Sequence, residues 1–275
     1  MSTRTNPDYG RAGRNLPLAT AVGVLLFAVF ALSLIYRPFI FALLAAIVML
    51  LAVAELSRAL VAELPAEVRK VLLVSAPSMV LAAYFGGPQW LLVSFVIAVV
   101  AVLVSRLFHE QEKYVSNVSR AIFILTYAPL LSSFAVLLAA QKNGDLKVLT
   151  LVLLTIGADI GGYFAGVLFG KHPMAPRISP KKSWEGLVGA VLLEIGIGIA
   201  LWIFLFEGSW WKGALAGAIM AITATFGDLV ESMIKRDLGI KDMSRLVPGH
   251  GGIMDRLDSL VINAAVAWAL FALLV

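Results

Sequence analysis

The chain has 275 residues, of which 60% are hydrophobic and only 14% are charged. Soluble globular proteins carry about 25% charged residues, so this composition excludes an ordinary soluble domain and indicates an integral membrane protein. The net charge of +5 would suit a nucleic acid, but in a membrane protein the placement of basic residues matters more, and we expect no nucleic-acid partner. The absence of cysteine excludes disulfides and cysteine-ligated metal sites.

The predicted elements are helices, because a membrane span needs roughly 20 mostly apolar residues and the sequence contains nine such runs. We therefore expect an all-α, polytopic membrane protein. A polar cytoplasmic head at 1–15, expected to be disordered, precedes a five-helix membrane region at 16–140 and a catalytic membrane region at 141–275. The nine runs lie at about 16–36, 38–57, 70–86, 89–108, 117–140, 146–170, 183–206, 210–235 and 256–275.

The basic residues predict the orientation of these spans. All but four of the 22 lysines and arginines fall in the head and in every second connection after it. Positive charge accumulates on the cytoplasmic side of membrane proteins, so we expect a cytoplasmic N-terminus and two cytoplasmic loops, at 171–183 and 236–255. The four exceptions are Arg37, Lys142, Lys147 and Lys212.

The sixth run contains glycines at four-residue spacing, in the series Gly162, Gly166 and Gly170 and in the pair Gly157 and Gly161. Small residues at this spacing let helices approach closely, so we interpret them as packing positions. They could serve the fold alone or a homodimer.

Carboxylates distinguish the last four runs from the first five, which are rich in Leu, Val and Ala. A carboxylate in a membrane span is costly and normally faces a cavity, a partner or an ion. Asp228, Glu231 and Lys235 fall on one helical face, and Asp255 and Asp258 would share a face if the last helix begins near Met254. Oxygen ligands without cysteine favour Mg²⁺, Mn²⁺ or Ca²⁺. The expected ligands are Asp159, Asp228, Glu231, Asp255 and Asp258.

Two of these carboxylates have simpler interpretations. Asp255 would be favourable in the first turn of a helix, and Asp258 could form an ion pair with Arg256 or Lys235. A glycine-rich loop at 248–252 weakens these interpretations, because backbone amides in such loops approach anions closely. In this loop His250 could be a general base, a phosphate donor or a strut.

The stretch ISPKKSWEG offers a second anion site. Ser183 is a natural N-cap, and Lys181 and Lys182 directly precede it, so a helix N-terminus and two cations would lie together. The alternative is that both lysines only orient the protein.

Three stretches resemble the phosphatidate cytidylyltransferase, or CDP-diacylglycerol synthase, family. GDLVESMIKRDLGIKDMSRLVPGHGGIMDRLDS at 227–259 resembles the family signature, which contains Ser232, Lys235-Arg236, Lys241-Asp242, a Pro-Gly-His-Gly-Gly loop and Asp255-Arg256-Leu257-Asp258. ISPKKSWEG is similar to the family's SPKKTWEG, with Ser183 in place of threonine. ADIGGYFAG resembles Asp-x-x-Ala-Tyr-Phe-x-Gly, with Gly162 in place of alanine. The resemblance covers roughly the C-terminal 120 residues.

This resemblance implies an enzyme of phospholipid biosynthesis. CTP and phosphatidate would give CDP-diacylglycerol and pyrophosphate, with one or two Mg²⁺ ions, among membrane lipids and on the cytoplasmic side of the inner (plasma) membrane. The implied catalytic residues are Asp228, Lys235, His250, Asp255 and Asp258. The implied substrate-binding residues are Ser179, Lys181, Lys182, Ser183, Glu185, Arg236, Lys241, Gly251, Gly252 and Arg256.

Three other functions remain to be weighed. An ion-coupled transporter would explain carboxylates in apolar runs but not the glycine-rich loop. A CDP-alcohol phosphotransferase would carry Asp-Gly-x₂-Ala-Arg and a later Asp-x₃-Asp, whereas this chain has Asp-x₂-Asp at 255–258. A cytidylyltransferase of the same type could act on another lipid phosphate, such as a polyprenyl phosphate or an ether lipid.

Overall fold

The computed structural model describes residues 16–60, 65–107, 113–244, 246 and 251–275, and within them the protein is helical, which confirms the all-α class. The head at 1–15, which we expect to be disordered, lies outside these residues. The helices are α1 (Leu16–Tyr36), α2 (Pro38–Leu60), α3 (Ala66–Ser105), α4 (Tyr114–Leu125), the π-helix η2 (Thr126–Leu130), α5 (Leu131–Ala139), α6 (Gly144–Phe169), α7 (Trp184–Phe206), α8 (Trp210–Asp237), the 3₁₀ turn η3 (Met254–Arg256) and α9 (Asp258–Leu274).

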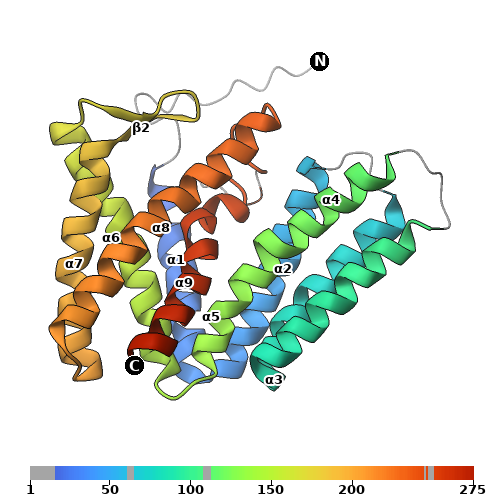
Figure 1. Ribbon diagram of the computed structural model, residues 1–275, viewed down its shortest axis with the longest axis horizontal. Coiled ribbons are helices and arrows are strands. Elements are labelled where there is room, and N and C mark those ends of the chain that lie inside the picture. Colours follow the sequence, from blue (N-terminus) through green and yellow to red (C-terminus); the bar gives the residue numbers. More distant parts are fainter. Residues whose placement is uncertain (1–15, 61–64, 108–112, 245, 247–250) are drawn as a thin grey trace.

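One expected loop is partly ordered as a β-hairpin. Strands β1 (Pro173–Ala175) and β2 (Ser179–Ser183) pair in antiparallel fashion, with Pro173 opposite Ser183. Figure 1 shows this hairpin at the upper edge of the molecule, near the end of α8 and the turn that precedes α9. The hairpin and the turn before α9 are far apart in sequence, yet they lie toward the same edge of the molecule.

Six helices in the described part of the chain are long and apolar enough to cross a membrane. They support a multi-pass membrane protein. The 40-residue α3 contains two of the predicted apolar runs and is interrupted at Gly87, whose φ of 68° and ψ of −159° are not helical. Pro88 follows this break, and Figure 1 shows both ends of α3 at the upper edge. The count of nine spans stays a prediction.

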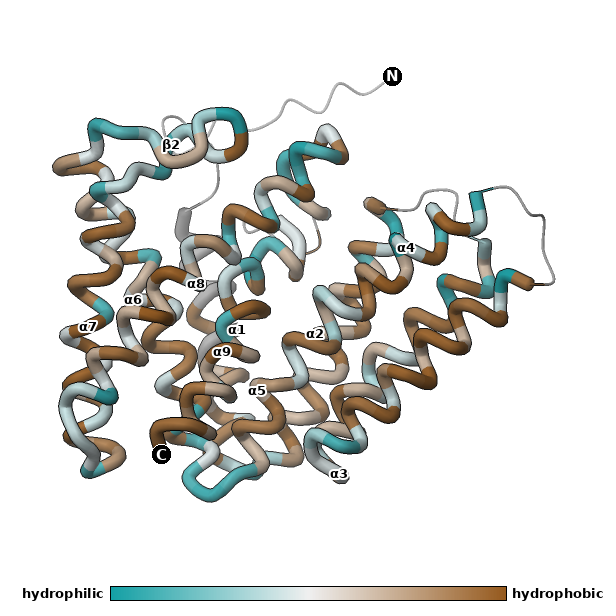
Figure 2. Tube along the Cα trace, in the orientation of Figure 1, coloured by the Kyte–Doolittle hydropathy of each residue, from teal (hydrophilic) through white to brown (hydrophobic). Residues whose placement is uncertain are grey.

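The outer faces of the helices are apolar, and their ends carry most of the polar residues (Figure 2). Phe204 and Leu273, for example, are each 81% exposed. Because lipid gives no hydrophobic drive for helices to associate, close backbone packing has to hold them together. α6, α7 and α8 pack in this way: Cβ atoms added at Gly157 or Gly161 would strike α7, as the glycine spacing predicted.

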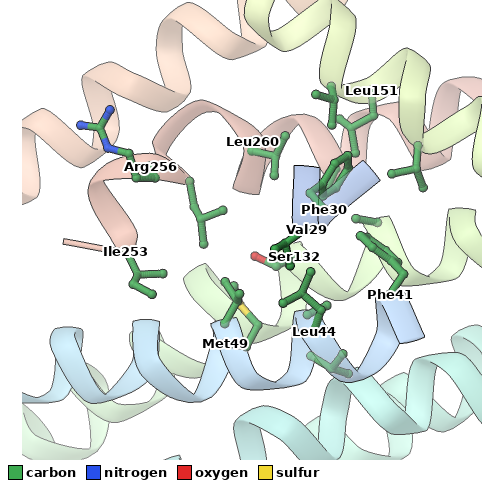
Figure 3. Close-up of a pocket in the computed structure, with 18 residues that line it drawn as sticks. Val29, Phe30, Phe41, Leu44, Met49, Ser132, Leu151, Ile253, Arg256 and Leu260 are labelled. Atoms are coloured by element: carbon green, nitrogen blue, oxygen red, sulfur yellow. The ribbon is translucent and has the colours of Figure 1, made fainter. Parts of the chain in front are cut away.

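A buried polar group ties three helices together below the upper edge. The Asn263 side chain on α9 accepts a hydrogen bond from Thr223 Oγ1 on α8 at 2.6 Å and donates to Thr155 Oγ1 on α6 at 3.1 Å. Side-chain hydrogen bonds between membrane helices fix their relative position. An apolar cavity of about 240 Å³ lies among α1, α2, α3, α5, α6 and α9 (Figure 3).

Candidate functional site

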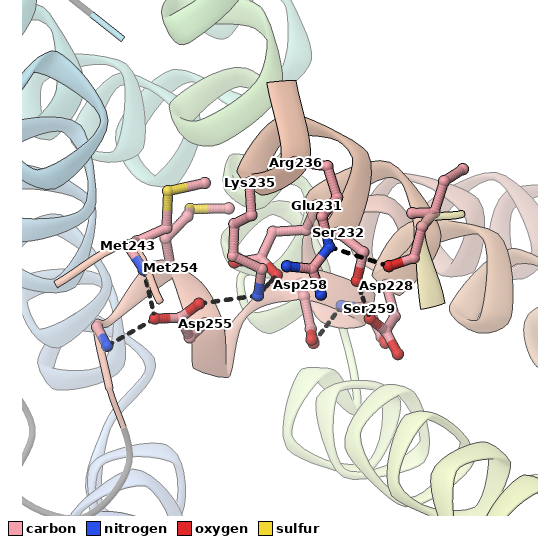
Figure 4. Close-up of polar contacts among 12 residues, drawn as sticks. Asp228, Glu231, Ser232, Lys235, Arg236, Met243, Met254, Asp255, Asp258 and Ser259 are labelled. Carbon is pink, nitrogen blue, oxygen red and sulfur yellow. Dashed lines mark hydrogen bonds and ion pairs between the residues drawn. The ribbon is translucent and has the colours of Figure 1, made fainter. Parts of the chain in front are cut away.

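Most of the predicted site residues gather at the upper edge, around the last turns of α8 (Figure 4). The expected helical face is present, because Asp228, Glu231 and Lys235 all belong to α8 and Lys235 forms an ion pair with Glu231. The Lys235 ammonium also donates to Asp255 Oδ1 at 2.9 Å. Both carboxylates are buried, so they hold this cation at one fixed place.

Asp255 is bound on both of its oxygens. Its Oδ2 accepts hydrogen bonds from the backbone N–H groups of Met243 at 2.9 Å and Gly252 at 2.8 Å. Burial by itself raises the pKa of Asp255, but the Gly252 amide and the Lys235 ammonium outweigh it and hold that pKa below its ordinary value. Asp255 is therefore an ionised anchor that joins the segment after α8 to Lys235.

Asp255 and Asp258 do not belong to one helix, because the last helix begins later than Met254. The chain makes the 3₁₀ turn η3 first, and α9 begins at Asp258. The Asp258 carboxylate accepts from the N–H of Ser259 at 2.7 Å, and it lies close enough to Asp228 and Asp159 for their charges to interact. α6, α8 and α9 thus each contribute one carboxylate to the same region.

The β-hairpin brings a lysine to these carboxylates. Lys182 Nζ lies 2.6 Å from Asp228 Oδ2 and donates to the Thr225 carbonyl at 3.1 Å. Arg236 Nε donates to the Ile178 carbonyl at 3.2 Å, which holds the hairpin against the end of α8. The hairpin is therefore fixed over the site at two points.

The base of the hairpin is organised by the start of α7. Ser183 is the N-cap, as predicted, and its hydroxyl accepts from the Gly186 N–H at 3.1 Å. The Glu185 carboxylate accepts from the N–H groups of Lys171 and His172, each at 3.2 Å, and lies 2.5 Å from His172 Nδ1. In this structure Glu185 supports the hairpin, and its role toward a substrate stays a prediction.

Sequence reasoning missed one residue of the site, Glu55 on α2. This carboxylate is only 3% exposed, and its Oε1 accepts from Ser244 Oγ at 2.5 Å and from the Ile253 N–H at 2.9 Å. Its Oε2 accepts from the Met254 N–H at 3.0 Å. The available signal was a carboxylate at the end of an otherwise apolar run, in the region that we interpreted as poor in chemistry.

The two described glycines of the 248–252 loop pack against these carboxylates. Gly251 has a φ of 83°, and a Cβ there would lie 2.9 Å from Asp255 Oδ2. A Cβ at Gly252 would lie 2.8 Å from Glu55 Oε2. The amides of 252–254 therefore bind carboxylates of the chain itself, and the phosphate role of the two glycines stays a prediction. His250, like Pro248 and Gly249, lies outside the described residues.

The remaining predicted substrate-binding residues form an accessible rim. Lys181, Arg236, Lys241 and Arg256 are exposed, and Ser179 is half-buried. Arg256 interacts with the charges of Asp258 and Asp159, so it lies beside the carboxylate region. Their roles toward a substrate stay predictions.

The expected metal ligands differ in how well they fit a cation. Asp228 and Asp258 are oxygen donors, and one or two carboxylates suit Mg²⁺, which completes its shell with water and phosphates. Asp255 and Glu231 fit less well, because Lys235 already binds both and backbone amides bind Asp255. Among the described residues no three such side chains stand ready to enclose an ion. The metal role of the five residues stays a prediction.

The fold and the site define an integral membrane protein with a polar site at one edge, where fixed cations and carboxylates lie beside an apolar cavity. The model of the cytidylyltransferase family matches residues 18–274, so the chain belongs to this family. The match includes the first five predicted spans, which the motifs alone did not reach.

Several relatives of this chain are named phosphatidate cytidylyltransferase. The phosphatidate cytidylyltransferase of Mycobacterium leprae (strain TN) is 39% identical over 296 residues, which cover 100% of this chain and 92% of that protein. The phosphatidate cytidylyltransferase of Mycobacterium bovis is 38% identical over 286 residues, which cover 97% of this chain and 92% of that protein. That of Pseudomonas aeruginosa is 42% identical over 128 residues, 44% of this chain and 47% of its own length.

Proposed function

We propose that this protein transfers the cytidylyl group of CTP to phosphatidate, giving CDP-diacylglycerol and pyrophosphate for phospholipid biosynthesis. One observation carries the proposal: relatives named phosphatidate cytidylyltransferase match this chain over its whole length. The cation-rich polar site of a membrane protein suits a reaction between a water-soluble nucleotide and a lipid phosphate.

In the reaction, a phosphate oxygen of phosphatidate attacks the α-phosphorus of CTP, and the bond to pyrophosphate breaks. Such transfers depend on positioning and on neutralising phosphate charge. Asp228 and Asp258 would hold Mg²⁺, which when bound supplies positive charge to the phosphates. Lys182 now pairs with Asp228, so it can exchange this partner for a phosphate oxygen and leave the carboxylate available.

Lys235 has a different role from Lys182. Its ammonium lies between two buried carboxylates, and only 15% of its side chain is exposed. A cation held in this way presents its charge at a fixed point of the site. We propose that it orients a phosphate without moving, whereas the half-buried Lys182 on the hairpin adjusts to the substrate.

For the membrane arrangement, we propose nine spans in the inner membrane, with the N-terminus and the site on the cytoplasmic side. The break of α3 at Gly87 supports two spans in that segment. The hairpin, whose second strand carries Lys181 and Lys182, lies at the upper edge (Figure 1), and Lys241 and Arg256 are exposed. Positive loops favour the cytoplasm. CTP is made available in the cytoplasm, so this orientation places the site within reach of both substrates.

The alternatives are less well supported. Family membership does not favour an ion-coupled transporter or an enzyme that consumes CDP-diacylglycerol. A cytidylyltransferase for another lipid phosphate differs only in the lipid, so the choice has to be made by assay.

The test is an assay of the purified protein with CTP labelled in its α-phosphate, with phosphatidate and with or without Mg²⁺. We expect labelled CDP-diacylglycerol only when CTP, phosphatidate and Mg²⁺ are all present. A polyprenyl phosphate in place of phosphatidate is the control for lipid identity. If labelled product forms with the polyprenyl phosphate and not with phosphatidate, the proposed substrate is wrong.

A further inference from the structure

The apolar cavity is bordered by one face of α2 and one face of the segment that leads into α9. Phe41, Ala45 and Met49 line it from α2 at helical spacing, and Leu260 and Ala264 line it from α9. The α2 wall extends from Phe41 to Met49, which is about 12 Å or two turns, and the α9 wall spans about one turn. Protein interiors are closely packed and contain few voids larger than a water molecule, so a cavity of about 240 Å³ is a candidate binding space.

The cavity runs from the upper edge, where the candidate site lies, toward the lower edge. At one end it is lined by Ile253 and Arg256, which belong to the turn that carries Asp255. At the other it is lined by Phe41 and Val148, close to the starts of α2 and α6, which Figure 1 shows at the lower edge. An occupant of this cavity therefore has one end at the polar site and the other inside the helical bundle.

The lining selects an amphipathic occupant. Of the described residues that line the cavity, only Arg256 is charged, and Figure 3 shows it at one end of the group. The Ser132 hydroxyl is also part of the wall, and it is buried without a hydrogen-bond partner among the described residues. Buried hydroxyls normally have a partner, so the wall suits an apolar chain that carries an ester oxygen and an anionic end.

We propose that this cavity holds one acyl chain of the lipid phosphate substrate, with the phosphate end at Arg256, and that its depth sets the accepted chain length. The inference rests on the proposed function, because it assigns a place to the lipid of that reaction. The cavity touches the active edge through Ile253 and Arg256, so a chain lying in it keeps the phosphate beside Asp258.

The experiment fills the cavity and compares two chain lengths. Ala264→Phe adds a ring from α9, and Ala135→Leu adds a smaller side chain from α5, in case the larger change prevents folding. Ala269→Phe is the matched control, because Ala269 lies on the exposed side of the same helix α9. Each purified variant is assayed with labelled CTP and either dioctanoyl or dioleoyl phosphatidate.

We expect each cavity variant to lose at least tenfold in kcat/KM for the dioleoyl lipid and to stay within twofold of wild type for the dioctanoyl lipid. The Ala269→Phe control should match wild type with both. If the two cavity variants fold and lose activity equally for both lengths, or lose none, the cavity does not hold the acyl chain. A wild-type protein inactive with both lipids would instead refute the proposed function, and the acyl-chain inference with it.

Discussion

Replacing Glu55 by glutamine should lower turnover, although Glu55 belongs to a helix far from the family motifs in sequence. Its carboxylate accepts three hydrogen bonds, from the Ser244 hydroxyl and from the N–H groups of Ile253 and Met254. Glutamine keeps one oxygen as an acceptor. Its NH₂ group, however, faces the donors whose hydrogen bonds the other carboxylate oxygen accepted. Hydrogen bonds to a charged group contribute about 1.5–3 kcal/mol, so the turn before α9 loses roughly that much.

This loss of free energy should produce a measurable decrease in kcat. Each 1.4 kcal/mol is about a factor of ten in an equilibrium constant, so the ordered turn becomes roughly ten- to a hundredfold less populated relative to disordered forms. Asp255 lies in this turn and holds Lys235, so the change should reduce kcat more than it alters KM for CTP. Glu55→Ala leaves all three donors without their acceptor and should reduce kcat further.

The assay is the steady-state formation of labelled CDP-diacylglycerol by purified variants at matched amounts. Glu207→Gln makes the same chemical change at an exposed position between α7 and α8 and should behave as wild type. Size-exclusion profiles check that Glu55→Gln remains folded. If its kcat and KM both stay within twofold of wild type, Glu55 does not position the catalytic turn.

Three further outcomes are expected. Activity should require Mg²⁺ or Mn²⁺ and disappear with a chelator, and Asp258→Asn should abolish turnover without loss of folded protein; near-wild-type activity of this variant at saturating Mg²⁺ would remove Asp258 from the ligands. Lys235→Arg and Lys182→Arg should lose most activity because the forked guanidinium does not fit a point contact, whereas Lys70→Arg should lose none; equal activity of all three would leave these lysines only an orienting role. A single cysteine introduced at position 182 should react with an impermeant thiol reagent only from the cytoplasmic side, and one at Lys142 only from outside; the reverse labelling would contradict the proposed orientation.

Local sequence was sufficient for the elements and for part of the site. Long apolar runs become helices in lipid because every backbone polar group must be satisfied within its own segment. A glycine followed by a proline disfavours a continuous helix, and the predicted runs that end at 86 and begin at 89 agree with the break at Gly87 in α3. The N-cap role of Ser183 and the common face of Glu231 and Lys235 are also decided within a few residues of chain.

The tertiary structure decided which carboxylates do what. Glu55 and Met254 are 199 residues apart, and no local pattern says that α2 ends beside the turn before α9. Asp255 contacts Lys235, whereas Asp258 lies near Asp228. This arrangement depends on the 3₁₀ turn η3, which the three-residue spacing in the sequence does not distinguish from an α-helix. The cavity at Arg256 likewise exists only because six separate helices pack with space between them. Helix formation follows from neighbouring residues, whereas the site depends on how finished helices pack, which hydropathy does not encode.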